Sequence, residues 1–201
     1  MRAAGLTVII LVSTGCVAEA PVDLAEGHEE VEAVTVIDAP GAEPGRYAPH
    51  NRGRVERGEY LVELLGCGSC HTNGALVGEP DVNRPLAGSR TGIAFTSPLD
   101  TNRPGVVYPP NITPEDDTGI GRWTERQIAD AIRAGIGRHG NRRIATMPWQ
   151  GYAKLTDDDV GAIVTYLRSI KPVRHEVPKS VEPGNLASSP YVYFGVYRRT
   201  R

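Results

Sequence analysis

The pentapeptide Cys67-Gly68-Ser69-Cys70-His71 is the sequence feature that most constrains how this chain can fold. Two thiols three positions apart can each add to one vinyl group of a haem, and the adjacent imidazole is then held under the iron as an axial ligand. Cys-x-x-Cys-His is the attachment motif of c-type haem. We therefore expect one haem c, bound covalently through Cys67 and Cys70, with His71 as a metal ligand.

Two other uses of a paired-cysteine motif stay open. A zinc half-site needs a second pair of ligands, and the chain's only other cysteine is Cys16, near the N-terminus. A thioredoxin-like redox pair normally opens a helix beside a βαβ pattern, which is absent here. The sequence favours haem over both.

The composition fits a domain whose core is not built from protein alone. The 201 residues provide one domain of ordinary size plus a tail. Gly and Pro make up 39 residues, so loops are extensive, and only twelve residues are aromatic. The core is therefore either small or supplemented by a non-protein group. The net charge of -2 argues against a general nucleic-acid binder.

The N-terminus has the pattern of an export signal. Met1-Arg2 is followed by an apolar run over residues 3–12, which is too short to span a bilayer and typical of a secretory signal. The run ends in Ser13-Thr14-Gly15-Cys16, which resembles a bacterial lipoprotein signal. We expect residues 1–15 to be a lipoprotein-type signal peptide and Cys16 to be lipidated, on the periplasmic side of a bacterial membrane. An ordinary signal peptide with an incidental cysteine is the alternative.

The next segment is acidic. Between Val17 and Asn51, eight carboxylates face one base, Arg46, and no apolar period is sustained. Such a composition predicts disorder, so we expect residues 16–51 to form a flexible tether; a cleaved leader is the alternative. Residues 52–201 carry 20 basic and 16 acidic groups. We divide them into a haem domain over 52–175 and an extended C-terminal tail over 176–201.

Three helices are expected in the haem domain. The first covers about residues 55–65. The second begins at Thr124-Glu125-Arg126-Gln127, a capping-box pattern, and carries Ile128, Ile132 and Ile136 on one stripe. The third opens at Thr156 with three aspartates, which the helix dipole favours, and ends at Lys171-Pro172. Residues 66–121 are expected to be mostly loop, and residues 191–194 to add a strand or dock on the body.

Met147 is the candidate for a second axial ligand. Met1 is lost with the signal, so Met147 is the only methionine expected in the mature domain. The following Pro148 disfavours helical geometry at Met147, so its thioether can project from an extended loop, although many methionines simply fill a core. His139 is the rival ligand; the other histidines are His28, His50 and His175.

Taken together, these motifs resemble a known family. The chain is similar to class I c-type cytochromes, and more narrowly to single-haem, membrane-associated bacterial cytochromes related to the cytochrome subunits of alcohol and gluconate dehydrogenases. The resemblance covers about residues 55–175 and rests on residues 57–62, Cys67–His71, 110–114, 118–121, Trp123, 147–149, Tyr152 and 155–167. It implies an all-α fold of three to five helices around one haem, with long loops, in which the first and last helices cross. Multi-haem relatives have further attachment motifs, whereas this chain has one.

A haem protein also needs groups around the ligands. A backbone carbonyl should accept a hydrogen bond from the second ring nitrogen of His71, and we expect Pro85 to supply it. Haem propionates have candidate partners in Trp123, Asn111, Trp149, Tyr152 or an arginine, each of which has plain packing as its alternative.

The predicted function is electron transfer, with no catalytic residues. With both axial positions filled, by His71 and Met147, no open site is left for peroxide or oxygen chemistry. The expected partners are a larger redox protein or a respiratory or photosynthetic membrane complex, and the membrane itself through the lipid anchor, with no nucleic acid. The alternatives are a fixed subunit of a dehydrogenase or oxidase complex, and a haem enzyme or gas sensor from which Met147 dissociates.

Overall fold

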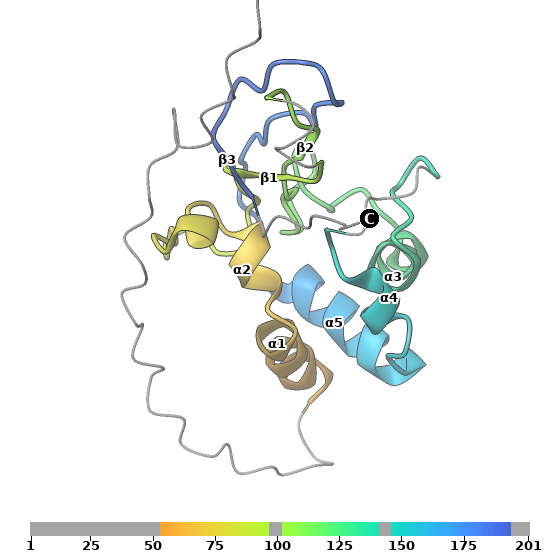
Figure 1. The fold of residues 1–201 in the computed structure, drawn as a ribbon. Coiled ribbons are helices and arrows are strands. Elements are labelled where there is room, and N and C mark those ends of the chain that lie inside the picture. The colour runs from red at the N-terminus through yellow and green to blue at the C-terminus, as the bar shows by residue number, and fades with distance from the viewer. Residues whose placement is uncertain (1–52, 97–101, 141–145, 194–201) are drawn as a thin grey trace, which may run out of the picture.

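The structure is a computed structural model that describes residues 53–96, 102–140 and 146–193. It is mainly helical, with a small sheet beside the helices (Figure 1). The elements in chain order are α1 (Arg54–Leu64), α2 (Cys67–His71), a 3-10 turn (Ala75–Val77), β1 (Gly92–Ala94), β2 (Val106–Val107), α3 (Glu125–Ala134), α4 (Trp149–Tyr152), α5 (Asp157–Ser169) and β3 (Tyr191–Tyr193). The predicted signal peptide, Cys16, the tether, His28 and His50 lie outside the described residues.

The three predicted helices are confirmed, and local chemistry sets their ends. The Thr124 hydroxyl accepts from the backbone N–H of Gln127 at 3.2 Å, and the Gln127 side chain accepts from the N–H of Thr124 at 2.9 Å, so the capping box starts α3. Gly135, at φ 63°, ends the helix in the left-handed conformation. The sequence also predicted Ile136 on the apolar stripe of this helix. Ile136 follows Gly135 and lies outside α3, so that part of the prediction is wrong.

The last helix begins and ends where the sequence indicated. The Thr156 hydroxyl accepts from the N–H of Asp159 at 3.1 Å, and three aspartates fill the first turn of α5. The chain leaves the helix at Ile170, which is extended before Pro172. One face of α5 is buried and joins α1 and α3 in the core cluster, whose fully buried members include Leu61, Val62, Ile128, Val160, Ile163, Val164 and Leu167.

The crossing of α1 over α5 is the most extensive contact between helices in the described part of the chain (Figure 1). Gly58 makes it possible: a Cβ there would overlap the carbonyl oxygen of Ala162 and lie 2.6 Å from Cβ of Tyr166. Arg57, on the same turn, pairs with Asp159 of α5. Burial alone raises the pKa of Asp159, but hydrogen bonds from Arg57 and Thr156 outweigh it and hold that pKa below its usual range. The expected crossing of the first and last helices is thus present.

The small sheet was not predicted as such. β1 pairs antiparallel with β2 and parallel with β3, in the order β2-β1-β3. β3 comes from the C-terminal tail, so the predicted strand at residues 191–194 is confirmed over Tyr191–Tyr193. The tail is also tied to the body earlier, by backbone hydrogen bonds in both directions between Val106 and Val181 at 2.8 and 2.9 Å. Among the described residues, no helix is long and apolar enough to cross a membrane.

Replacing Gly58 with alanine tests the helix crossing. We expect Gly58→Ala to lower the free energy of unfolding by about 1–3 kcal/mol, because the added methyl forces the backbones of α1 and α5 apart. Gly151→Ala is the matched control, since a Cβ at Gly151 meets no atom within 4 Å. Thermal unfolding of the purified protein measures both. Equal stability of the two variants would contradict the close approach.

Candidate haem site

A cavity of about 500 Å³ lies between the helices and the loops that precede α3. Its walls come from α2, α3, α4 and α5, from residues 107–112 and 118–120, and from residues 146–148. Most of the lining is apolar, including Leu65, Ile112, Ile120, Ile128, Ile132 and Leu167. Its size falls within the range of about 300–1,000 Å³ that is usual for cofactor sites.

The cysteine motif forms the short helix α2 at one wall of this cavity. Gly66, at φ 67°, turns the chain between α1 and α2. Residues at i, i+3 and i+4 of a helix lie on one face, and Cys67, Cys70 and His71 have this spacing. All three line the cavity.

The imidazole of His71 is fixed by one backbone carbonyl. Its Nδ1 lies 2.7 Å from the carbonyl oxygen of Pro110. A carbonyl oxygen can only accept, so Nδ1 carries the proton, and the neutral ring has its lone pair on Nε2. This is the tautomer in which Nε2 can bind a metal.

The prediction that Pro85 supplies this carbonyl is wrong. The residue after it, Leu86, donates its N–H to the Thr72 hydroxyl at 3.1 Å, so that loop is fastened to Thr72 and not to the His71 ring. The carbonyl of His71 itself accepts from the N–H of Gly88 at 2.7 Å. Both prolines lie in loops after the motif, and no local pattern distinguishes which of them returns to the His71 ring.

Cys67 and Cys70 form no disulfide. Burial raises the pKa of Cys67 to about 11, and burial also raises the pKa of Cys70. Both are therefore protonated at neutral pH, whereas the attacking cysteine of a dithiol redox pair has a lowered pKa. Among the described residues, no group of three or more His, Cys, Asp or Glu side chains is placed to hold a metal ion, as a zinc site requires.

Met147 reaches the same cavity from a distant part of the chain. It lies just before α4, is half-buried, and lines the cavity together with Thr146 and Pro148. The rival His139 is exposed and does not line the cavity. His175 is buried elsewhere, with Nδ1 2.9 Å from the carbonyl of Ala87.

The candidate propionate partners differ in what they already bind. Trp123, Asn111 and Tyr152 line the cavity, and Trp149 does not. Burial raises the pKa of Tyr152, and its hydroxyl donates to the carbonyl of Leu65 at 3.1 Å. Asn111 is 2% exposed and its amide is bonded at both ends within the protein, so the suggestion that it holds a propionate is wrong.

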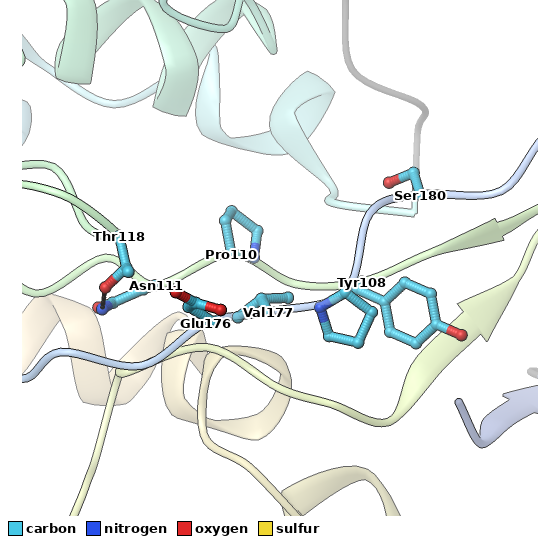
Figure 2. A pocket seen from close by; sticks show the side chains of 8 residues that line it. Tyr108, Pro110, Asn111, Thr118, Glu176, Val177 and Ser180 are labelled. Atoms are coloured by element: carbon cyan, nitrogen blue, oxygen red, sulfur yellow. Dashed lines mark hydrogen bonds between the residues drawn. The ribbon is translucent and has the colours of Figure 1, made fainter. Parts of the chain in front are cut away.

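The C-terminal tail contributes residues that the sequence did not indicate. Ser180 and Glu182 line the large cavity. A second cavity of about 390 Å³ lies between the tail and residues 108–111, and Figure 2 shows the residues that line it, among them Glu176 and Val177 from the tail and Tyr108 and Pro110 from the loop. The tail has no pattern of polarity that would have placed it here.

Comparison with known proteins agrees with this arrangement. The sequence profile of the family described as Cytochrome c matches residues 55–171, more than half of the chain. The chain belongs to the cytochrome c family. Membership implies covalently bound haem c, and a mainly helical fold of this kind is confirmed.

The relatives include subunits of dehydrogenases. The chain is 36% identical over 152 residues to the fructose dehydrogenase cytochrome subunit of Gluconobacter japonicus, covering 75% of this chain and 28% of that protein. It is 37% identical over 120 residues to the cytochrome c subunit of a quinone-type alcohol dehydrogenase of Gluconobacter oxydans, covering 59% and 22%. For the gluconate 2-dehydrogenase cytochrome c subunit of Pantoea cypripedii, the identity is 32% over 124 residues, covering 61% and 25%. The chain thus spans about a quarter of the length of these relatives.

The residues of the cavity fit a haem. The lining is apolar, two thiols and one imidazole lie on one wall, and the imidazole has the tautomer that iron binding needs. Cys67 and Cys70 would hold the group through thioethers, and His71 would be the axial ligand on the same side.

Removing both thiols tests covalent attachment. In a Cys67→Ser/Cys70→Ser double variant, we expect acidified butanone to extract any bound haem, because no carbon–sulfur bond remains, while the native protein keeps its haem in the aqueous phase. Mass spectrometry of the native chain should show the added mass of one haem. Ser69→Ala, between the two thiols, is the matched control and should behave as the native protein. Extraction of haem from the native chain would contradict the assignment.

Proposed function

We propose that this protein is a mono-haem cytochrome c that transfers single electrons between redox partners, with His71 and Met147 as the axial ligands of the iron. The observation that carries the proposal is that one apolar cavity is lined by Cys67, Cys70, His71 and Met147. The chain has one attachment motif, which supports one haem.

Each residue has a defined task in this proposal. The haem iron, when bound, supplies a one-electron couple between Fe(III) and Fe(II). His71 is aimed by Pro110, which also makes the imidazole a better donor. Met147 supplies a thioether, a ligand that raises the reduction potential.

The apolar walls act on the same equilibrium. Ile120, Ile128 and Leu167 give the cavity an apolar wall, and a medium of low polarity disfavours the state with the higher charge. Among the described residues that line the cavity, Glu182 is the one carboxylate. The site therefore favours a stable reduced state and small rearrangements on electron transfer, as an electron carrier needs.

The partner is proposed to be a larger redox protein, such as a dehydrogenase or another membrane complex. The relatives named above are cytochrome subunits of dehydrogenases, which supports the second candidate, a fixed subunit of such a complex. Both candidates share one chemistry and no catalytic residue. They differ in whether the protein leaves its partner, which separation of a detergent extract by size would decide.

A Met147→Ala variant tests the electron-transfer proposal against a haem enzyme or gas sensor. We expect the oxidised native protein to show the weak far-red band of methionine–iron ligation, and the reduced native protein not to bind carbon monoxide. In Met147→Ala the band should vanish and carbon monoxide should bind, because an axial position opens. His139→Ala is the control and should keep the native spectrum. An unchanged spectrum in Met147→Ala would overturn the ligand assignment, and carbon monoxide binding by the native protein would favour the sensor.

Membrane attachment through a lipidated Cys16 is part of the proposal and is supported by the sequence of residues 1–16 alone. We expect the mature chain to begin at Cys16 with a diacylglyceryl group and the protein to fractionate with membranes on the periplasmic side. A Cys16→Ala variant should lose the lipid and appear in the soluble fraction. Mass spectrometry of the N-terminus checks this directly, and an unmodified mature N-terminus at another residue would rule the anchor out.

A further inference from the structure

His71 is held at two points, one on its ring and one on its backbone. The Pro110 carbonyl accepts from Nδ1 at 2.7 Å, and the N–H of Gly88 donates to the His71 carbonyl at 2.7 Å. Both partners lie in loops, so something else must fix the position of each loop.

The loop that carries Pro110, the partner of the His71 ring, is fixed by Asn111. Its Nδ2 donates to the carbonyl of Val173 at 2.7 Å and to the Thr118 hydroxyl at 3.0 Å. Its Oδ1 accepts from the N–H of Thr113 at 2.9 Å. The N–H of Val173 in turn donates to the Thr113 hydroxyl at 3.2 Å. The residue next to Pro110 is thus tied to the chain that follows α5.

The loop that carries Gly88, the partner of the His71 carbonyl, is fixed by His175. Its Nδ1 donates to the carbonyl of Ala87, next to Gly88, at 2.9 Å, and its N–H donates to the Thr118 hydroxyl at 3.1 Å. His175 as a whole is 8% exposed. The packing here is tight, since a Cβ on Gly88 would lie 2.5 Å from Cγ2 of Val177.

The residues that hold the two loops, Val173 and His175, lie in one short segment of the chain. Val173 and His175 are two residues apart, and both follow residue 171, where the family match ends. Further along, the Val106–Val181 backbone pair and β3 attach this segment to the sheet. Figure 2 shows the segment beside Pro110 and Asn111, with the hydrogen bond between Asn111 and Thr118 drawn.

We propose that Asn111 and His175 are positioning residues for the proximal ligand, and that the C-terminal segment, residues 173–181, is a brace that sets the haem reduction potential through the His71–Pro110 hydrogen bond. The inference rests on the proposed role of His71 as an iron ligand. A held carbonyl keeps the Nδ1–H hydrogen bond strong, which raises the basicity of the imidazole and favours Fe(III). Loosening the brace weakens this bond and shifts the couple toward Fe(II).

The test compares variants of the full-length holoprotein. His175→Leu removes the donor to Ala87, whereas His175→Asn keeps a side-chain N–H near the place of Nδ1. Asn111→Ala removes the side-chain hydrogen bonds that tie the loop of Pro110 to Val173 and Thr118. Thr156→Ala is the control for general destabilisation. Loss of the α5 N-cap costs about 0.5–2 kcal/mol and leaves the hydrogen bonds of Asn111 and His175 in place. The readouts are the midpoint potential from a redox titration and the hydrogen-exchange rate of the His71 Nδ1 proton in the reduced protein, measured by NMR.

We expect His175→Leu to raise the ratio of reduced to oxidised protein at a fixed potential by about threefold and to speed exchange of the Nδ1 proton by about fivefold. His175→Asn should return most of both values, and Asn111→Ala should shift both in the same direction as His175→Leu. Thr156→Ala should lower stability and change neither.

The brace is overturned if His175→Leu leaves both readouts at native values, if His175→Asn resembles His175→Leu, or if Thr156→Ala shifts them equally. Should Asn111→Ala not give a folded holoprotein, the His175 pair decides alone. A native protein with a methionine–histidine spectrum and unshifted variants overturns only the brace. Absence of covalent haem in the native protein would instead overturn the proposed function.

Discussion

The hydrogen bond from Nδ1 of His71 to the carbonyl of Pro110 is the interaction on which the site depends. It selects the tautomer, orients the ring, and joins the helix of the cysteine motif to the loop at residues 107–113. Asn111 and Thr113 in that loop are buried polar residues, so their amide and hydroxyl groups must find partners within the protein. Asn111 meets this need by bonding to Thr113, Thr118 and Val173. The fixing of the proposed ligand His71 thus extends through the loop to the chain after α5.

The cavity explains how a chain with only twelve aromatic residues can form a core. The buried cluster is built from aliphatic side chains on α1, α3 and α5, such as Val62, Ile128 and Ile163, and the cavity lies beside it. A haem would supply the large apolar surface that aromatic residues supply elsewhere. Gly58 also helps to form a core without bulky side chains, because it lets α1 and α5 approach closely enough to enclose a small core.

Local signals predicted the helices well and the loops poorly. Thr124 with Gln127, and Thr156 with the following aspartates, start helices through contacts within four residues, so sequence alone could find them. Pro110 could not be told from Pro85, because the choice depends on how a long loop folds back on α2. His175 gave no signal either: its partner, Ala87, is a backbone carbonyl far away in the chain, and a carbonyl is present at every residue.

The sequence by itself determined the chemistry of this protein: two thiols and an imidazole at fixed spacing, one methionine before a proline, and helices with readable ends. These depend on bonds and contacts between near neighbours, which the order of residues specifies. Only the tertiary structure decided that Met147 lines the same cavity as His71, which carbonyl orients the imidazole, and that Ser180 and Glu182 of the C-terminal tail also line this cavity. Those relations join segments far apart in the chain, and they are fixed by the packing of α1 against α5 and by the need of buried polar groups for partners.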